Sequence, residues 1–290
     1  MFGMSVDGNY LQKTYEVEGK LGAGGSGEVY KVWHNRLRKH FALKAHKAGI
    51  AGLFDTHINE AEALKNLKSS YVPQIFDFFT DEKTSYTIME YIEGDSFDKL
   101  LLHKGKFKIS KVTKWYYQLA AALEEIHKKD ICHRDIKPSN IMLSKNGDIC
   151  LIDFDAAIIG DKSTGLISHS HGYASPEQTA FFNICKTVYL KCAGCINTAG
   201  NQSKAKEPVR SGSKINWKLS DIYSLGATMH KLLTGVYTTE KENILKITKK
   251  NKGLAELEKV INRSMHQKPK ERFPSAQKLK HAIAEAMMYY

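Results

Sequence analysis

The sequence has few of the features that mark secreted, fibrous or membrane-spanning chains. Its five cysteines are odd in number and unevenly spread, unlike the disulfide framework of a secreted protein. With 6 prolines, 21 glycines and no short repeat, the chain is neither collagen-like nor of low complexity. No apolar run is long enough to span a membrane, and residues 1–13 contain neither a basic leader nor an apolar block. We therefore expect a cytoplasmic chain without a membrane span.

The composition is that of a folded globular chain with an excess of basic residues. At 290 residues, with 42% hydrophobic and 26% charged residues, the chain can form one large domain or two lobes. Its 43 Lys and Arg against 31 Asp and Glu give a net charge of +12, which favours acidic partners or phosphates. Most basic residues are dispersed, as on a solvated surface, so nucleic acid is not an expected partner.

Residues 14–92 show the pattern of strands with one helix among them. Runs typical of strands occur at residues 14–21, 28–33, 40–46, 75–80 and 85–92. Helical spacing over 56–69 places Glu60 on the apolar face of that helix. Because an acid on an apolar face needs a partner, and Lys44 is the nearest candidate along the chain, we expect these two side chains to pair.

After residue 100 the pattern becomes mainly helical. Ser110 is expected to cap one long helix, and Ser220 to open another that stops at Gly235. The tail is expected to form helices broken at Pro269 and Pro274. A β-rich front and an α-rich back predict an α+β fold with a ligand cleft between two lobes.

One segment, about residues 178–219, differs in composition from the rest of the chain. It holds seven basic residues against one acid, and its second half is rich in Gly, Ser, Asn and Lys. It also contains Cys185, Cys192 and Cys195, but a zinc site would need a fourth ligand, and no His or Cys follows nearby. We expect a partly mobile basic insertion with reduced cysteines.

A glycine-rich stretch lies between two of the predicted strands. It contains Gly22, Gly24, Gly25 and Gly27, and such backbone can approach phosphates closely and offer N–H donors. The pattern alone fits an unrelated turn equally well. A dinucleotide-binding unit would continue into a helix, whereas a strand containing Val29 follows here.

The densest chemical signal is the run from His133 to Asn140. Asp135 supplies a carboxylate for a hydroxyl proton, Lys137 a cation for a transferred phosphate, and Asn140 an amide for a metal. Asp153 ends an apolar strand and can hold Mg²⁺ on its oxygens. Together these residues indicate phosphoryl transfer.

The order of these motifs resembles that of the eukaryotic-like protein kinases, especially the bacterial Ser/Thr members, over roughly residues 15–283. The resemblance implies a bilobal protein-kinase-like fold with a β-rich N-lobe and an α-rich C-lobe. Residues 1–14 would be an N-terminal extension, 15–92 the N-lobe and hinge, and 93–290 the C-lobe.

The resemblance also implies the site residues. The catalytic set would be Asp135, Lys137, Lys44 and Glu60, with Asn140 and Asp153 binding Mg²⁺, for which Mn²⁺ is an alternative. The residues that would contact ATP are Gly22, Gly24, Gly25, Gly27, Val29, Ala42, Lys44, Met89, Glu90, Tyr91, Ile92, Met142 and Asp153.

Supporting residues follow from the same resemblance. Glu177 of Ser-Pro-Glu would form a salt bridge with Arg272, and Asp221 would hold the catalytic loop from below. Arg134 would pair with a phosphorylated residue of the activation loop, where Ser163, Thr164, Ser168 and Ser170 are available.

Three departures from the family pattern stand out. Asp155 replaces the usual Gly of Asp-Phe-Gly; Asp tolerates left-handed backbone, but it adds charge near the metal. Ser170 replaces the usual Thr and keeps a hydroxyl able to bond Asp135. The segment that contains the three cysteines is about 30 residues longer than in the family.

The function that the resemblance implies is transfer of the γ-phosphate of Mg-ATP to Ser or Thr hydroxyls of proteins, including the kinase itself. The alternative is a pseudokinase that binds nucleotide without turnover, which Asp155 and the insertion would motivate. Ser-Pro-Glu, Asp221 and Arg272 argue against a small-molecule kinase, because by resemblance they build the platform for a protein substrate.

Overall fold

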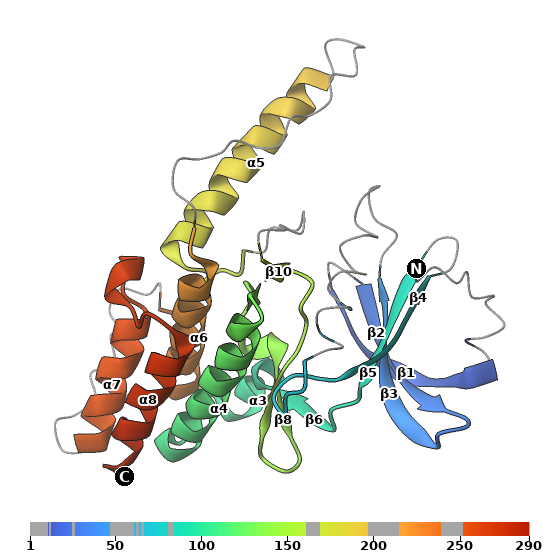
Figure 1. Ribbon diagram of the computed structural model, residues 1–290, viewed down its shortest axis with the longest axis horizontal. Helices are drawn as coiled ribbons and strands as arrows, with labels where there is room; N and C mark the ends of the chain where they lie inside the picture. Colours follow the sequence, from blue (N-terminus) through green and yellow to red (C-terminus); the bar gives the residue numbers. More distant parts are fainter. Residues whose placement is uncertain are drawn as a thin grey trace.

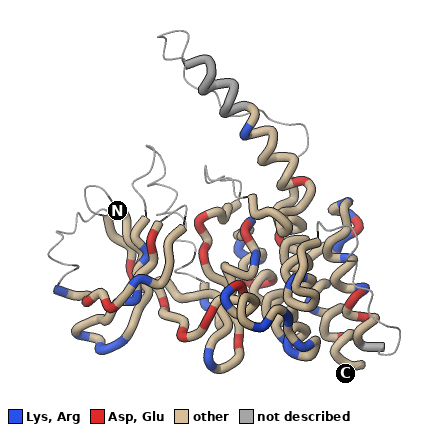
Figure 2. The backbone as a smooth tube through the Cα atoms, turned by 180° about the vertical axis from the view of Figure 1, so that it is seen from behind, with Lys and Arg blue, Asp and Glu red and all other residues tan. Residues whose placement is uncertain are grey.

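The protein has a β-sheet at one end and a helical body at the other (Figure 1). The computed structural model describes residues 11, 13–24, 27–46, 61, 64, 67–80, 84–160, 169–196, 215–238 and 252–289. Within these, only the backbone of 188–196 and 252–253 is described. Lys and Arg, and Asp and Glu, are scattered over both parts of the protein (Figure 2). The α+β architecture agrees with the fold predicted from the sequence.

The sheet at the N-terminal end is antiparallel, with strand order β1-β2-β3-β5-β4. Its strands are β1 (Tyr15–Ala23), β2 (Gly27–His34), β3 (Lys39–His46), β4 (Ile75–Thr80) and β5 (Ser85–Glu90). They form where the sequence predicts strands, and β-branched and aromatic residues are most frequent in β4, with five in six residues. Val32, Phe41 and Ile88 are buried in the small core of this lobe. A Cβ at Gly27 would lie 2.2 Å from the Ala45 carbonyl oxygen, so only glycine fits there.

The helical body is built around one long central helix, α4 (Ile109–Lys128), which packs against α8 (Ala276–Met287) and α6 (Trp217–Thr234). The remaining helices there are α3 (Phe97–Lys104), α7 (Lys252–Ser264) and the short 3₁₀ turn η2 (Pro269–Glu271). Breaks at both prolines of the tail are confirmed. This body contains the larger of the hydrophobic cores.

Two helix starts differ from the sequence predictions. Helix α4 begins at Ile109, not after Ser110, because Ile109 itself packs against the core and is thereby drawn into the helix. Helix α6 begins at Trp217, where the Asn216 side chain accepts a hydrogen bond from the Leu219 amide. Gly235 ends α6 in a left-handed conformation (φ 79°), as predicted.

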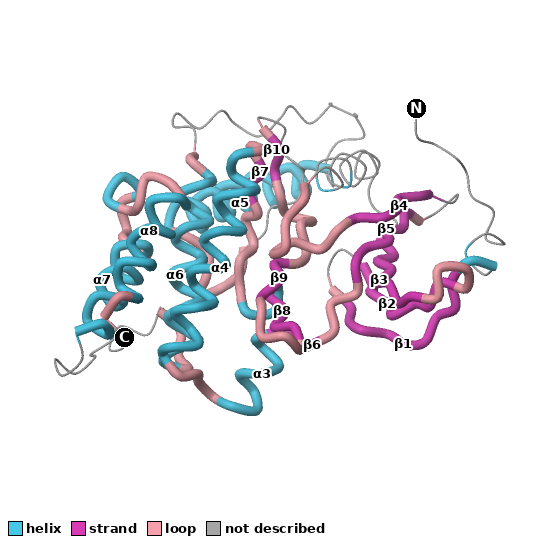
Figure 3. Tube along the Cα trace, turned by 60° about the horizontal axis from the view of Figure 1, so that its bottom comes forward, coloured by secondary structure: helices cyan, strands magenta, loops and turns pink. Residues whose placement is uncertain are grey.

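Short strands lie between the large sheet and the helices (Figure 3). They are β6 (Gly94–Ser96), β7 (Ile131–Cys132), β8 (Ile141–Ser144), β9 (Ile149–Leu151) and β10 (Ile158–Ile159). Strands β6, β8 and β9 form one small sheet and β7 pairs with β10. The 3₁₀ turn η1 (Pro138–Asn140) directly precedes β8. These strands fix both ends of the loops that carry the predicted catalytic residues.

Helix α5 (Pro176–Ile196) extends away from the rest of the protein (Figure 1). The sequence predicted a partly mobile basic insertion over about residues 178–219. Its first part lies in a 21-residue helix, in which proline occurs only at the first position and glycine only at 194, and which is rich in apolar residues. Residues 197–214, with most of the basic residues, lie outside the described part. Over the part of the chain that is described, no helix is both long and apolar enough to cross a membrane.

Candidate active site

A cleft of about 710 Å³ lies between the large sheet and the small strands. It is lined by nearly every residue that the resemblance assigned to ATP, metal or catalysis. The exceptions are Gly25 and Glu60, which lie outside the described residues. The predicted site residues therefore meet in one place, although they are spread over more than a hundred positions of the sequence.

One end of the cleft has apolar walls. Val29 and Ala42 come from β2 and β3, Met89 from β5 and Met142 from β8, and all four line the cleft. Ladder pairing sets Ala42 opposite Met89, so the two side chains enter the cleft at one level. An apolar slot of this kind suits a flat aromatic base.

The glycine-rich turn leaves open space beside the cleft. A Cβ built on Gly22 or on Gly24 meets no atom within 4 Å. The glycines are therefore not required by crowding within the protein itself, in contrast to Gly27. Open backbone on the cleft wall is what a phosphate chain needs for close approach.

Asp135 lies at the centre of a hydrogen-bonded cluster on the loop of residues 133–140, between β7 and β8, which we call the catalytic loop. Its carboxylate accepts from Lys137 Nζ (2.8 Å), Ser170 Oγ (2.6 Å) and Asn140 Nδ2 (3.1 Å). Burial acts to raise the pKa of Asp135, but the bonds from Lys137 and Ser170 outweigh it, so its pKa lies below the ordinary value. The bond from Ser170 confirms that this serine replaces the usual threonine as a partner of Asp135.

Asp221 holds the catalytic loop from the core, as expected. Its fully buried carboxylate accepts from the backbone amides of His133 (2.9 Å) and Arg134 (2.8 Å) and lies 2.9 Å from His127 Nε2. Arg134 has a left-handed backbone (φ 64°), which is strained for a residue with a side chain. The two amide bonds to Asp221 stabilise that conformation. His127 is a member of this support that the sequence analysis missed, although it lies on the buried face of α4.

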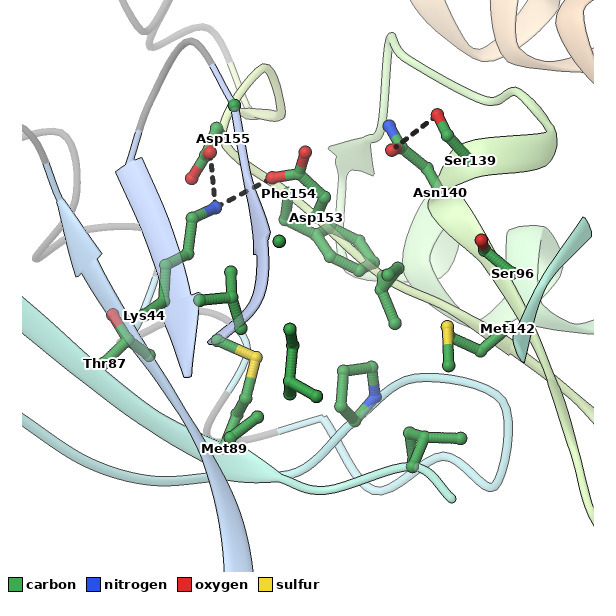
Figure 4. A pocket seen from close by; sticks show the side chains of 18 of the residues that line it. Lys44, Thr87, Met89, Ser96, Ser139, Asn140, Met142, Asp153, Phe154 and Asp155 are labelled. Carbon is green, nitrogen blue, oxygen red and sulfur yellow. Dashed lines mark hydrogen bonds and ion pairs between the residues drawn. The ribbon is translucent and has the colours of Figure 1, made fainter. Parts of the chain in front are cut away.

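Lys44 on β3 makes contacts that the sequence did not predict. Its ammonium bonds to Asp153 Oδ1 at 2.8 Å and forms a still closer ion pair with Asp155 (Figure 4). The expected pair with Glu60 falls outside the described residues. The only sequence signal for the new partner was the departure from Asp-Phe-Gly at Asp155.

The left-handed backbone near this contact is at Asp153 (φ 64°), whereas Asp155 is not among the residues with positive φ. The tolerance of Asp for left-handed backbone, noted from the sequence, is therefore not needed at residue 155. A side chain at this position carries no backbone strain of that kind.

Asn140 and Asp153 supply oxygens that fit a divalent cation. Both side chains line the cleft (Figure 4). The amide nitrogen of Asn140 donates to Asp135, which leaves its oxygen with a single weak bond of 3.3 Å from Ser139. Carboxylate and amide oxygens are the ligands that Mg²⁺ prefers. These residues thus fit the metal that the fold family implies.

A buried ion pair joins the start of α5 to the turn before α8. Arg272 Nη1 and Nη2 donate to the two oxygens of Glu177 at 2.7 and 2.9 Å, and the guanidinium also lies over Tyr223. This confirms the expected partnership. Because Arg272 also donates to the Leu219 carbonyl, the pair ties three segments of the helical body together.

Arg134 does not extend toward solvent in this structure. Its side chain is buried, and its guanidinium lies 4.8 Å from the centroid of the Trp217 ring at the start of α6. Of the four candidate phosphorylation sites, Ser163, Thr164 and Ser168 lie outside the described residues, and the hydroxyl of Ser170 donates to Asp135. Pairing of Arg134 with a phosphorylated loop thus stays a prediction.

Comparison with known proteins agrees with the geometry. Residues 15–196 match the family model for the protein kinase domain. The serine/threonine-protein kinase PknL of Mycobacterium tuberculosis is 30% identical over 78% of this chain, and a probable serine/threonine-protein kinase of Clostridium acetobutylicum is 27% identical over 94%. The Aurora kinase of Saccharomyces cerevisiae is 36% identical over 56% of the chain.

The chain spans only part of each of these relatives, from 40% of the clostridial protein to 50% of PknL. The matched segment includes the glycine-rich turn, Lys44, the catalytic loop and Asp153, which the structure brings to one cleft. The family match and the shared site lead to one conclusion: the chain belongs to the protein kinase domain family.

Proposed function

We propose that the chain is an ATP- and Mg²⁺-dependent serine/threonine protein kinase. The observation that carries the proposal is the cluster at Asp135, which faces the same cleft as Lys44, Asn140 and Asp153. A carboxylate that accepts hydrogen bonds from three donors and is ionised at neutral pH is suited to orient and deprotonate a hydroxyl. The names of the curated relatives support Ser or Thr as the acceptor.

In this mechanism the apolar end of the cleft binds adenine and the glycine-rich turn covers the phosphates. Lys44 orients the phosphate chain through its ammonium group. The metal held by Asn140 and Asp153 would neutralise charge on the phosphates. Asp135 receives the proton of the attacking hydroxyl, and Lys137 stabilises the charge that develops on the transferred group.

The remaining parts of the proposal concern partners and location. A protein with exposed Ser or Thr is the proposed substrate, and the chain itself is a candidate through autophosphorylation. The division into N-lobe and hinge (15–92) and C-lobe (93–290) belongs to the proposal. So does a reducing cytoplasmic location, which the free thiols of Cys132, Cys150 and Cys185 support.

A second candidate, a nucleotide-binding pseudokinase, is favoured by one observation. The Lys44 ammonium is paired with two carboxylates, whereas the phosphates of ATP would need that ammonium as their own partner. In the described part of the cleft, the other groups that phosphate transfer requires are in place. Catalysis is therefore the better supported function.

The test is phosphate transfer by the purified chain. We expect Mg-ATP to add phosphate to the protein or to a generic basic protein, measured by intact mass and by phosphoamino-acid analysis. Asp135→Asn should abolish transfer while binding of ATP persists in calorimetry. The matched control is Asp148→Asn, an exposed carboxylate outside the cleft lining, which should leave transfer unchanged.

Binding of Mg-ATP by the unmodified protein without any transfer would replace the kinase proposal by the pseudokinase. Full activity of Asp135→Asn would refute the role of that residue. Phosphotyrosine as the sole product would contradict the Ser/Thr assignment.

A further inference from the structure

Asp155 lies where the family has glycine, and its side chain enters the active-site cleft. Only 10% of the side chain is exposed, and its carboxylate forms an ion pair with Lys44. The Asp153 carboxylate, two residues earlier, bonds to the same ammonium at 2.8 Å (Figure 4). Lys44 thus lies between two carboxylates of one short segment.

The position of Lys44 is fixed by the sheet. It pairs with Val29 on one side and Thr87 on the other in the centre of β3. Its ammonium can therefore move only by rotation of its own side chain. The segment of Asp153 and Asp155 follows β9, which is held in the small sheet by β8. Two fixed elements thus bring the three charges together.

The two carboxylates differ in exposure. The Asp153 side chain is 39% exposed and fits a divalent cation, whereas Asp155 is largely buried. A buried carboxylate depends more strongly on a nearby cation, because it has little water to solvate it. When a divalent cation occupies Asp153, it repels the Lys44 ammonium, and Asp155 is the carboxylate that retains it.

We propose that Asp155 is a positioning residue, which holds Lys44 in the phosphate region of the cleft and leaves Asp153 to the divalent cation. The inference rests on the proposed binding of Mg-ATP in this cleft. The role goes beyond the family pattern, since a glycine at this position has no carboxylate to offer.

A clear consequence is competition when Asp155 is removed. With Asn or Gly at position 155, the ammonium shifts toward Asp153, so a cation has to displace Lys44 from that carboxylate. The need for Mg²⁺ should rise, and it should do so only while Lys44 is present. A carboxylate that ligated the metal directly would show its effect with or without Lys44.

The experiment is a double-mutant cycle on nucleotide binding, which requires no turnover. Affinity for ADP is measured by calorimetry over a range of free Mg²⁺ in four proteins: unmodified, Asp155→Asn, Lys44→Met, and both together. We expect Asp155→Asn to raise the Mg²⁺ concentration for half-maximal affinity by roughly tenfold, within the range for residues in contact. In the Lys44→Met background the same change should have an effect below about twofold.

Asp155→Gly, which restores the family residue, is the second variant and should behave like Asp155→Asn. Urea unfolding of each variant verifies that it is folded, and Asp148→Asn is again the control. An equal rise of the Mg²⁺ requirement with and without Lys44 would assign Asp155 to the metal itself and overturn the proposal. No change in either background would overturn it as well.

Failure of the inference is distinct from failure of the proposed function. If the unmodified protein binds no nucleotide in the presence of Mg²⁺, the proposed function fails before the double-mutant cycle begins. If it binds nucleotide and transfers phosphate, but Asp155→Asn leaves the Mg²⁺ dependence unchanged, only the positioning role is lost.

Discussion

At the scale of single residues, Asp135 shows how a carboxylate is kept ionised inside a cleft. Desolvation alone would raise its pKa, and the donors Lys137 and Ser170 reverse that effect. Its carboxylate is therefore anionic at every pH above its ordinary value of 3.8. Protonation of Asp135 should not limit activity near neutral pH.

Ser170→Ala tests this arrangement. The change removes one of the bonds that lower the pKa of Asp135, while the bond from Lys137 remains, so we expect the loss to come from poorer orientation of the carboxylate and not from its protonation. We expect kcat to fall by roughly tenfold, with no change in the shape of the pH profile between 6 and 8. Ser170→Thr should retain activity because it keeps the hydroxyl. A shift of the acidic limb toward neutral pH in Ser170→Ala would contradict the explanation.

The sequence predicted most of these residues and some of their partners, such as Ser170 for Asp135, but not the contact of Lys44 with Asp155. Short motifs such as His133 to Asn140 carry their chemistry locally, so their roles can be inferred from spacing alone. The contact between Lys44 and Asp155 joins two elements more than a hundred residues apart, and no local pattern encodes that distance. The departure at position 155 was visible, yet its meaning required the position of the lysine in the folded sheet.

At the scale of elements, the stability of the helical body depends in part on Glu124 of α4. Its carboxylate accepts from Lys128 on the same helix at 2.7 Å and forms a close ion pair with Lys280 of α8. These bonds lower the pKa of Glu124 from the ordinary value of 4.5. The contribution is thus present above pH 4.5 and is lost as the pH falls through the lower pKa of the folded state.

Glu124→Gln should therefore destabilise the protein only where Glu124 is ionised. We expect a loss of about 1 kcal/mol in the free energy of unfolding at pH 7, measured by urea. The difference between the variant and the unmodified protein should narrow as the pH falls below 4.5 and through the lower pKa of the folded state. A difference that persists or grows in acid would show that the effect is steric and not ionic.

Arg272→Ala addresses the buried ion pair with Glu177. Because the truncation leaves the Glu177 carboxylate and nearby carbonyls without their donor, the expected loss in the free energy of unfolding is about 3–5 kcal/mol. Arg272→Lys should recover only part of it, since lysine cannot donate to both carboxylate oxygens in the same fork. A variant with lysine as stable as the unmodified protein would argue that charge alone is sufficient. Thermal and urea unfolding provide the measurements.

Helix boundaries and α5 mark the limits of prediction at this scale. The buried stripe of α4 follows the apolar spacing, so the existence of that helix was predictable. Its start was not, because the packing of Ile109 against the core decides it and not the nearest serine. Helix α5 was missed because residues 178–219 were interpreted together. The Gly, Ser, Asn and Lys content of the second half of that segment hid the helical character of the first half.

At the scale of the whole molecule, the cleft should couple nucleotide binding to folding. The lining residues come from both the large sheet and the helical body, so a bound nucleotide contacts both parts. Mg-ATP at 100 times its dissociation constant should stabilise the folded state by about 2.7 kcal/mol, which thermal unfolding would detect. Asp153→Asn should reduce this gain when Mg²⁺ is present. An unchanged midpoint with saturating Mg-ATP would contradict binding to the folded state.

The two-part architecture was predictable because the change from strands to helices along the chain is abrupt. A long-range arrangement such as the strand order β1-β2-β3-β5-β4 was not predicted from the sequence. Physical patterns predict which elements form, whereas their order in space depends on contacts between distant residues.

The thiols of Cys132 and Cys150 can report how often the folded protein opens. Both are buried, on β7 and β9, and burial raises the pKa of each, so neither reacts readily in the native state. Timed alkylation in the presence of the intact fold should modify the partly exposed Cys185 before Cys132 and Cys150. Mass spectrometry counts the adducts on the two buried sulfurs. The delay before they appear measures how often the structure around β7 and β9 opens.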